Sequence, residues 1–184
     1  MPLSRPALAM AAAFLTAWGG SMAQSGIASA GPALLAARPL QFPVDGIRPE
    51  TMRDTFEDGR PGHRHEALDI MAPRGTPVRA VDDGQLVKLF DSKPGGLTIY
   101  QFDPAGQLAY YYAHLDRYAE GLHEGMQLQR GQLIGYVGTT GNAASDAPHL
   151  HFAVFLLGPE RQWWKGEALN PLDALRSTAR APPR

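Results

Sequence analysis

The sequence predicts an all-β fold with a mainly antiparallel, sandwich-like core and long loops. Three observations support this. Short runs with strand-like composition recur from Phe42 onward, residues typical of turns separate them, and no amphipathic helix of three or more turns follows the first 23 residues. The expected strands are Pro77–Val81, Gln85–Phe90, Leu97–Asp103, Leu108–Ala113, Leu133–Val137 and Leu150–Leu157.

Turn chemistry bounds these strands in chain order. Residues 82–84 (Asp-Asp-Gly) separate the first two strands, residues 93–96 (Lys-Pro-Gly-Gly) the second and third, and residues 103–106 (Asp-Pro-Ala-Gly) the third and fourth. Residues 140–142 (Thr-Gly-Asn) lie between the last two strands. After the last strand, Leu169–Ser177 has room for one short turn or helix.

Size and composition favour one globular domain. The chain has 184 residues, of which 44% are hydrophobic and 19% charged. Its formal net charge of -1 gives no sign of a nucleic-acid partner, and no apolar run is long enough to predict a transmembrane segment. The chain contains no cysteine, which excludes disulfides, a cysteine nucleophile and an acylated cysteine. A metal site would therefore use nitrogen and oxygen ligands.

The N-terminus has the features of a secretory signal peptide over residues 1–23. Residues 1–5 supply a positive start, residues 7–18 form an apolar run too short to cross a bilayer, and Ser21-Met22-Ala23 offers small residues for cleavage. A second such site at residues 28–30 leaves the cut open by a few residues. The alternative is a buried N-terminal helix, but the basic start and small-residue ending favour export.

The rest of the chain divides by composition. Residues 24–41 are rich in Ala, Ser, Gly and Pro, which predicts a flexible linker. We expect the folded domain to span residues 42–178 and a tail to cover residues 179–184.

Histidines mark the candidate chemistry. His149 and His151 are two residues apart in an expected strand, so both rings point to one side, where they could share a hydrogen-bond network or face a metal. His65 and Asp69 form a second pair, which alone is a weak signal, and His114 lies on a third segment. A catalytic zinc site commonly has three protein ligands, such as two imidazoles and one carboxylate, and a fourth position that is open to water.

Five motifs in order carry a family resemblance: HEALD, APRGTPVRA, YAHLD, GMQLQRGQLIGYVGTTGN and PHLHF. From about Phe56 to Leu157 the chain resembles the lysostaphin-type (LytM-domain) zinc metallopeptidases, which cut peptidoglycan cross-links. The resemblance implies a β fold of the duplicated-hybrid-motif type. It also implies that His65, Asp69 and His151 hold Zn²⁺, and that His114 and His149 flank a zinc-activated water.

Two positions depart from the family pattern. The family commonly has Gly between the first two ligands, where this chain has Ala67, and the extra methyl is tolerable unless the backbone needs positive φ. Some members carry a Tyr shortly before the first ligand that supports the transition state. The corresponding stretch TFEDGRPGHR has none, so that role is vacant or filled by Arg60 or another group.

The resemblance predicts a zinc metalloendopeptidase that acts on peptidoglycan peptides. The signal-peptide features and the alanine- and arginine-rich composition predict that it is exported and periplasmic. One of His114 and His149 would take the water's proton and pass it to the leaving amine, and the other would stabilise the oxyanion. The sequence leaves open which does which, the bond cut, the oligomeric state and any autoinhibition by residues 24–55. Zinc binding and activity are expected to fall below about pH 6, because ligating histidines must be neutral.

Two other functions fit parts of the sequence. A non-catalytic LytM-like protein would bind cell wall or activate an amidase, but such relatives have usually lost metal ligands. A biotinyl or lipoyl carrier would need a Lys in a hairpin, whereas Lys88 lies inside an expected strand.

The remaining histidines and the tryptophan pair have simpler expectations. His123 is expected in a solvated loop, and His63 is expected to point away from the site, with a supporting contact to the metal ligands as the alternative. Trp163 and Trp164 are expected to pack at the sheet edge, with a rim contact for a polymer as the alternative.

Overall fold

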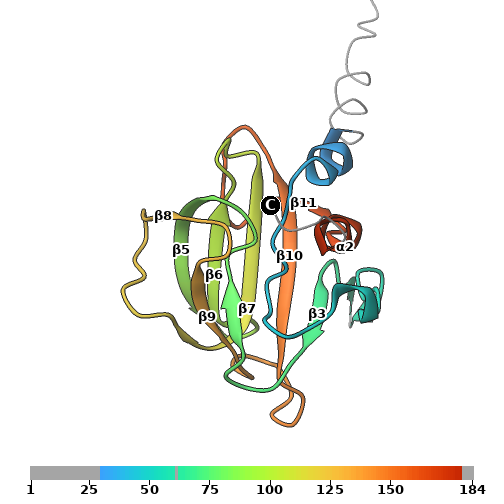
Figure 1. Ribbon diagram of the computed structural model, residues 1–184, viewed down its shortest axis with the longest axis vertical. Helices are drawn as coiled ribbons and strands as arrows, with labels where there is room; N and C mark the ends of the chain where they lie inside the picture. The colour runs from blue at the N-terminus through green and yellow to red at the C-terminus, as the bar shows by residue number, and fades with distance from the viewer. Residues whose placement is uncertain (1–29, 61, 180–184) are drawn as a thin grey trace, which may run out of the picture.

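The computed structural model describes residues 30–60 and 62–179, so the expected signal peptide lies outside the described residues. Strands are the main regular structure of the described chain, and long loops join them (Figure 1). The elements are η1 (Pro49–Thr51), β1 (Gly59–Arg60), β2 (His63–Arg64), β3 (Leu68–Met71), β4 (Pro77–Arg79), β5 (Gly84–Ser92), β6 (Gly96–Phe102), β7 (Leu108–Tyr118), β8 (Gln127–Leu128), β9 (Leu133–Val137), β10 (His149–Leu157), β11 (Gly166–Leu169) and α2 (Leu172–Ala179).

Nine strands form one branched sheet in which every pairing is antiparallel. The main path runs β11-β10-β7-β6-β5-β8. Strand β3 pairs with the first half of β10, and β9 pairs with both β4 and the second half of β7. Strands β1 and β2 form a separate hairpin. The prediction of an all-β, mainly antiparallel fold is confirmed.

All six predicted strands are present, but shorter ones were not predicted. Strand β3 has only four residues and begins two residues after Glu66, whose φ is 54°, so it is too short to show a clear alternation in the sequence. Strand β11 also has four residues, three of them glycine, glutamate or alanine. The short C-terminal helix, expected within Leu169–Ser177, is α2.

The core lies on one face of the long strands. In β10, Leu150, Phe152 and Val154 are buried, whereas the alternate residues from His149 onward face outward. Strand β7 follows the same period, with Tyr110 and Tyr112 buried and Tyr111 half-buried on the other face. This alternation presents the histidines of β10 on the outer face of the sheet.

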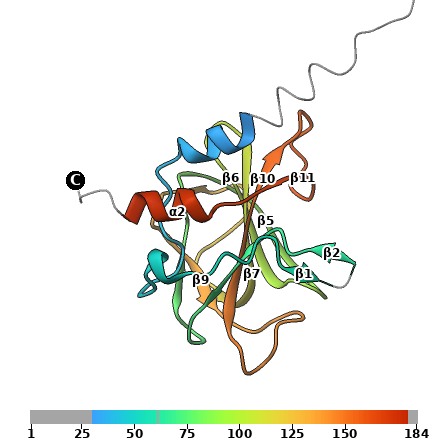
Figure 2. The same ribbon diagram turned by 90° about the vertical axis from the view of Figure 1, so that its right-hand side faces the viewer.

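The segment expected to be a linker belongs partly to the folded unit. Residues 30–36 are helical (Figure 2). Leu35 and Leu40 are core residues that are 2% and 0% exposed. Arg38 pairs with the buried carboxylate of Asp103, and Gly31 lies against Leu169. The linker expected at residues 24–41 therefore does not include residues 30–41. Alanine, which suggested a linker, is also the strongest helix former, and two apolar side chains suffice to anchor one short helix.

A hydrogen-bonded group that we call the inner network (Asp82, Gln101, Tyr110 and Tyr112) lies inside the core. The Tyr110 hydroxyl donates to Asp82 Oδ2 at 2.9 Å, and the Tyr112 hydroxyl donates to Gln101 Oε1 at 2.8 Å. Gln101 Nε2 donates to the backbone carbonyl of Asp82 at 2.7 Å. No buried side-chain nitrogen or oxygen in the described part of the chain lacks a partner. Burial raises the pKa of Asp82 above its ordinary value, although the bond from Tyr110 opposes the shift.

Within residues 30–60 and 62–179, none of the helices combines the length and the hydropathy needed to cross a bilayer.

Candidate metal centre

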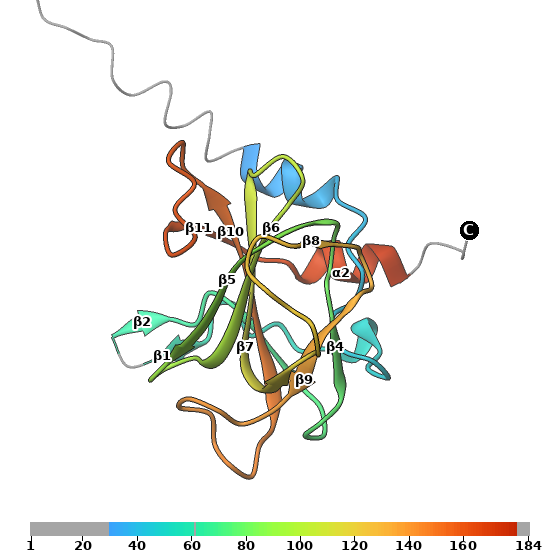
Figure 3. The same ribbon diagram turned by 90° about the vertical axis from the view of Figure 1, so that its left-hand side faces the viewer.

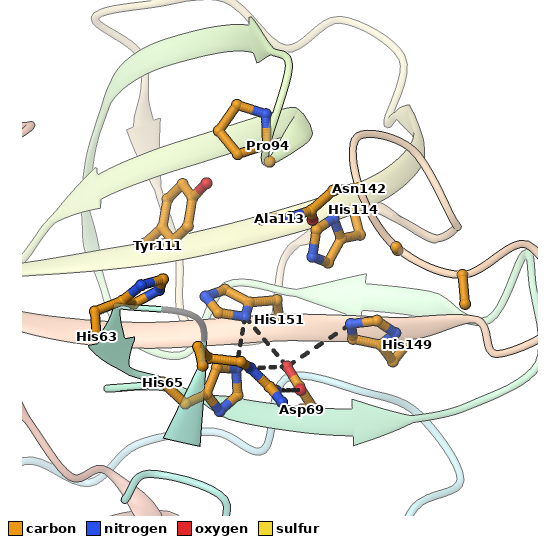
Figure 4. A pocket seen from close by; sticks show the side chains of 14 residues that line it. His63, His65, Asp69, Pro94, Tyr111, Ala113, His114, Asn142, His149 and His151 are labelled. Carbon is orange, nitrogen blue, oxygen red and sulfur yellow. Dashed lines mark hydrogen bonds and ion pairs between the residues drawn. The ribbon is translucent and has the colours of Figure 1, made fainter. Parts of the chain in front are cut away.

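Three side chains bring one ligand atom each to a single point on the outer face of the sheet (Figure 4). His65 Nε2 lies 3.0 Å from Asp69 Oδ1 and 3.0 Å from His151 Nδ1. The third side of the triangle, from His151 Nδ1 to Asp69 Oδ1, is 3.1 Å. The convergence required by the sequence hypothesis is therefore present.

Strand pairing explains how distant stretches of chain meet here. Strand β10 lies between β3 and β7, and its register places His151 directly opposite Asp69 on one side and Ala113 on the other. His65 lies outside the strand, beyond Glu66, whose left-handed backbone turns the chain back toward the same point. Ala67, which replaces the family's Gly, is not among the described residues with positive φ, so its methyl group causes no backbone strain.

Thr55 holds the ring of His65 and the backbone of Asp69, and the sequence did not indicate it. Its backbone carbonyl accepts a hydrogen bond from His65 Nδ1 at 2.9 Å, which leaves the lone pair of Nε2 toward the centre. Its hydroxyl donates to the carbonyl of Ala67 at 3.2 Å and accepts from the backbone N–H of Asp69 at 3.0 Å. Thr55 thus ties His65 and Asp69 together.

Arg60 holds the other oxygen of Asp69. Its guanidinium donates to Asp69 Oδ2 at 2.7 Å from the β1–β2 hairpin, so Oδ1 alone faces the two histidines. Burial acts to raise the pKa of the Asp69 carboxyl, but hydrogen bonds from His151 and His65 outweigh it, and the pKa lies well below its ordinary value. Asp69 is therefore an anion at neutral pH.

The donor set fits zinc. Zinc bonds of about 2.0–2.1 Å in a tetrahedron place neighbouring donors roughly 3.3 Å apart, close to the spacing of these three atoms. Two imidazole nitrogens and one carboxylate oxygen are common zinc ligands, and burial lowers the pKa of His151, which favours its neutral, ligating form. Three protein ligands leave one tetrahedral position for water or substrate, which is typical of catalytic sites.

His114 and His149 stand beside this triangle. Their ring centroids are 4.9 Å apart, and His149 Nε2 lies 3.7 Å from Asp69 Oδ1. His114 Nδ1 donates to the carbonyl of Thr140 and His149 Nδ1 to that of Ala147, each at 2.9 Å, so both rings keep a basic Nε2. Burial lowers the pKa of His114 to about 4 despite the bond to Thr140, so this ring is neutral at pH 7.

The backbone of His114 is unusual. Its φ of 60° lies in the left-handed region, and its N–H donates to the carbonyl of Gly95 at 2.8 Å. In turn, the hydroxyl of Thr140 donates to the carbonyl of Leu115. This irregular point in β7, between its pairing with β10 and its pairing with β9, turns the imidazole toward the metal centre.

The centre opens into a cavity of about 440 Å³. It is lined by all five predicted site residues and by Arg60, Tyr111 and Asn142 among others. His63 also lines this cavity, so the expectation that it points away from the site is wrong (Figure 4). Strand parity does not support that expectation, because residues 63 and 65 are two apart and share a side of an extended chain, as His149 and His151 do. His123 is exposed, as expected.

Comparisons with known proteins agree with this arrangement. The model of peptidase family M23 matches residues 63–171, more than half of the chain. The L-Ala–D-Glu endopeptidase of Bacillus subtilis strain 168 is 31% identical over 147 residues, which are 76% of this chain and 44% of that protein. The DD-carboxypeptidase/endopeptidase Mpg of Neisseria meningitidis serogroup B is 33% identical over 115 residues, covering 62% of this chain and 23% of that protein.

A solved structure extends the similarity to three dimensions. The antimicrobial peptidase lysostaphin from Staphylococcus simulans superposes with a TM-score of 0.57 at 29% sequence identity, covering 69% of this chain and 49% of that one. The chain spans less than half the length of each of these three proteins.

Proposed function

Because the chain belongs to peptidase family M23, we propose that it is a zinc metalloendopeptidase that hydrolyses peptide bonds in peptidoglycan. The observation that supports this most strongly is the triangle of His65 Nε2, Asp69 Oδ1 and His151 Nδ1, which we propose as the zinc ligands. The two curated relatives are endopeptidases, and their names specify different peptide bonds. We therefore propose the substrate class and leave the particular bond open.

The surrounding residues have complementary tasks. Bound zinc supplies Lewis acidity for the attacking water and the peptide carbonyl. His114 and His149 are the proposed catalytic residues: one Nε2 accepts the proton of the attacking water, and the other ring, once protonated, stabilises charge on the carbonyl oxygen. Arg60 keeps Asp69 oriented, and its donors at the cavity are available for the charge that a missing tyrosine would otherwise stabilise.

We also propose that residues 1–23 direct export and that the protein acts in the periplasm, where peptidoglycan is accessible. The basic start, short apolar run and small-residue site support this. The folded peptidase unit would then begin near residue 30, where the described helix packs on the core.

Alanine variants of individual histidines test the proposal, with purified sacculi as substrate. His65→Ala and His151→Ala should lose both zinc, measured by elemental analysis, and muropeptide release, measured by mass spectrometry. His114→Ala should keep zinc and lose activity by about 10²–10⁴-fold. The exposed His123→Ala is the matched control and should keep both.

Other results of these assays would contradict the proposal or favour the alternative function. Full hydrolysis in the presence of a chelator, or undiminished activity of His65→Ala, would contradict the proposal. Zinc and sacculus binding without any hydrolysis by the wild-type protein would instead favour the non-catalytic, wall-binding function.

A further inference from the structure

A row of aromatic rings leads away from the metal centre across the outer face of the sheet. Tyr111, which lines the catalytic cavity, lies 5.9 Å from the ring of His151, and Tyr100 lies 4.6 Å from Tyr111. Trp163 follows at 4.7 Å from Tyr100, and Trp164 at 5.2 Å from Trp163. Phe90 flanks Trp163 at 5.6 Å. We call these five residues the aromatic strip.

The strip and the catalytic cavity share one face. Tyr111 is paired in register with Tyr100 on β6 and with Ala153 on β10, two residues from His151. The loop between β10 and β11 supplies both tryptophans, and it projects to the same side of the sheet as the β1–β2 hairpin (Figure 3). At the far end, Tyr100, Phe155, Trp163, Trp164 and Lys165 line a cavity of about 230 Å³.

Large exposed hydrophobic side chains gather on this surface. Three large hydrophobic side chains are exposed in the described residues: Trp164 at 62%, Met71 at 55% and Phe90 at 41%. Two of them belong to the strip, and Met71 is paired in register with His149 beside the metal centre. Exposed apolar side chains that gather on one face mark a binding surface.

The chemistry of the strip favours sugar rings as its occupant. Strands β6 and β7 are internal to the sheet, so their backbone groups are already paired and offer a peptide backbone no strand edge. The rings of Tyr100, Tyr111 and Trp163 follow one another with centroids 4.6–4.7 Å apart, so they form a continuous aromatic surface. Flat aromatic platforms suit ligands that present an apolar face and polar edges, as the C–H face and hydroxyl rim of a pyranose do.

The distances also suit this occupant. Three steps of 4.6–5.9 Å separate His151 from Trp163. An extended peptide of three or four residues spans roughly 10–14 Å, so a bond held at the metal centre would place the attached sugar over the tryptophans. We propose that the aromatic strip binds sugar rings of the peptidoglycan strand whose peptide enters the catalytic cavity. This inference rests on the proposed function.

The decisive measurement compares two substrates that differ only in sugar. One is a cross-linked muropeptide dimer that carries its disaccharides, and the other is the same dimer after an amidase has removed them. The wild-type protein should show about tenfold higher kcat/KM for the sugar-bearing dimer. Trp164→Ala should reduce that ratio to about 1, and Trp164→Phe should keep most of it. Tyr136→Ala, a half-buried aromatic on β9 that stacks under Arg117, should keep the wild-type ratio.

A binding assay separates this inference from the proposed function. Titrating the zinc-free protein with an N-acetylglucosamine tetramer should change tryptophan fluorescence saturably, and Trp164→Ala should lose the change. Binding without hydrolysis of either dimer would refute the proposed function and support the strip. Equal wild-type rates on both dimers, or a Trp164→Ala variant that slows both equally, would overturn the inference. So would a strip that mediates self-association, detected by sedimentation, with no response to the sugar.

Discussion

Strand β7 carries polar side chains on both faces, and the two sets are built differently. On the core side, the hydroxyls of Tyr110 and Tyr112 bond to Asp82 and Gln101, and each buried group has a partner within the protein. On the outer side, His114 faces the triangle of His65, Asp69 and His151, whose ligand atoms point at one another.

The difference distinguishes a stabilising cluster from a reactive one. In the inner network, donors meet acceptors, so no external group is needed. In the outer cluster, two nitrogen lone pairs and one carboxylate oxygen converge, which is favourable only when a cation or protons lie between them. Counting polar residues would not separate the two clusters, but matching donors with acceptors does.

The largest expected effect comes from breaking the inner network alone. Asp82→Ala leaves the Tyr110 hydroxyl without its buried acceptor and removes one of the carboxylates that pair with Arg38. The free energy of unfolding should therefore fall by about 3 kcal/mol. Urea unfolding in chelator measures this, and zinc affinity should stay within about threefold. The exposed neighbour Asp83→Ala serves as control, and a loss of zinc binding in Asp82→Ala would contradict the separation of the two faces.

Thr55→Val tests the outer cluster without removing a ligand. The valine keeps the shape of the side chain but loses the hydroxyl that joins Ala67 and Asp69, so zinc affinity should fall by about 10–100-fold. Competition with a chromogenic chelator gives the affinity. Thr51→Val removes an exposed hydroxyl that bonds only to the carbonyl of Arg48, and it should bind zinc like the wild type.

The smallest effect is expected from pH near neutrality. The pKa values of Asp69 and His151 both lie below their ordinary values, so each is already in its ligating form at pH 7. Zinc affinity should therefore change by less than about threefold between pH 8 and pH 7. At pH values under about 6 the affinity should decrease, because protons compete with zinc for the histidine nitrogens. Zinc titrations across this range test it, and a steep loss between pH 8 and pH 7 would show that the ligands are still protonated there.

Strand-like composition predicted the long strands, whereas the residues of the centre were predicted from the family motifs together with strand periodicity. The H-x-H spacing places two rings on one face of any strand, and Leu150, Phe152 and Val154 mark the opposite face as core. Once β3 pairs with β10, the register brings Asp69 to His151. Regular periodicity thus carries information from local sequence to the site.

Irregular backbone and long-range support were not predictable in this way. The left-handed φ of Glu66, a non-glycine residue between His65 and Asp69, has no signal in the sequence. Thr55 acts through contacts ten or more residues away, and nothing in its sequence neighbours distinguishes it from a surface threonine. The helix at residues 30–36 was not predicted, because linkers and helices can both be rich in alanine. Only the packing of Leu35 and Leu40 into the core shows that this segment is part of the folded unit.

The left-handed backbone of His114 lowers the stability of the fold but places an imidazole that the proposed activity needs. A residue with a Cβ pays roughly 1–2 kcal/mol in that conformation, whereas glycine does not. A library screened only for heat resistance would therefore be expected to enrich glycine or asparagine at position 114 and to yield sturdier, inert proteins. A screen that scored digestion of cell walls as well would retain the imidazole and accept the conformational penalty.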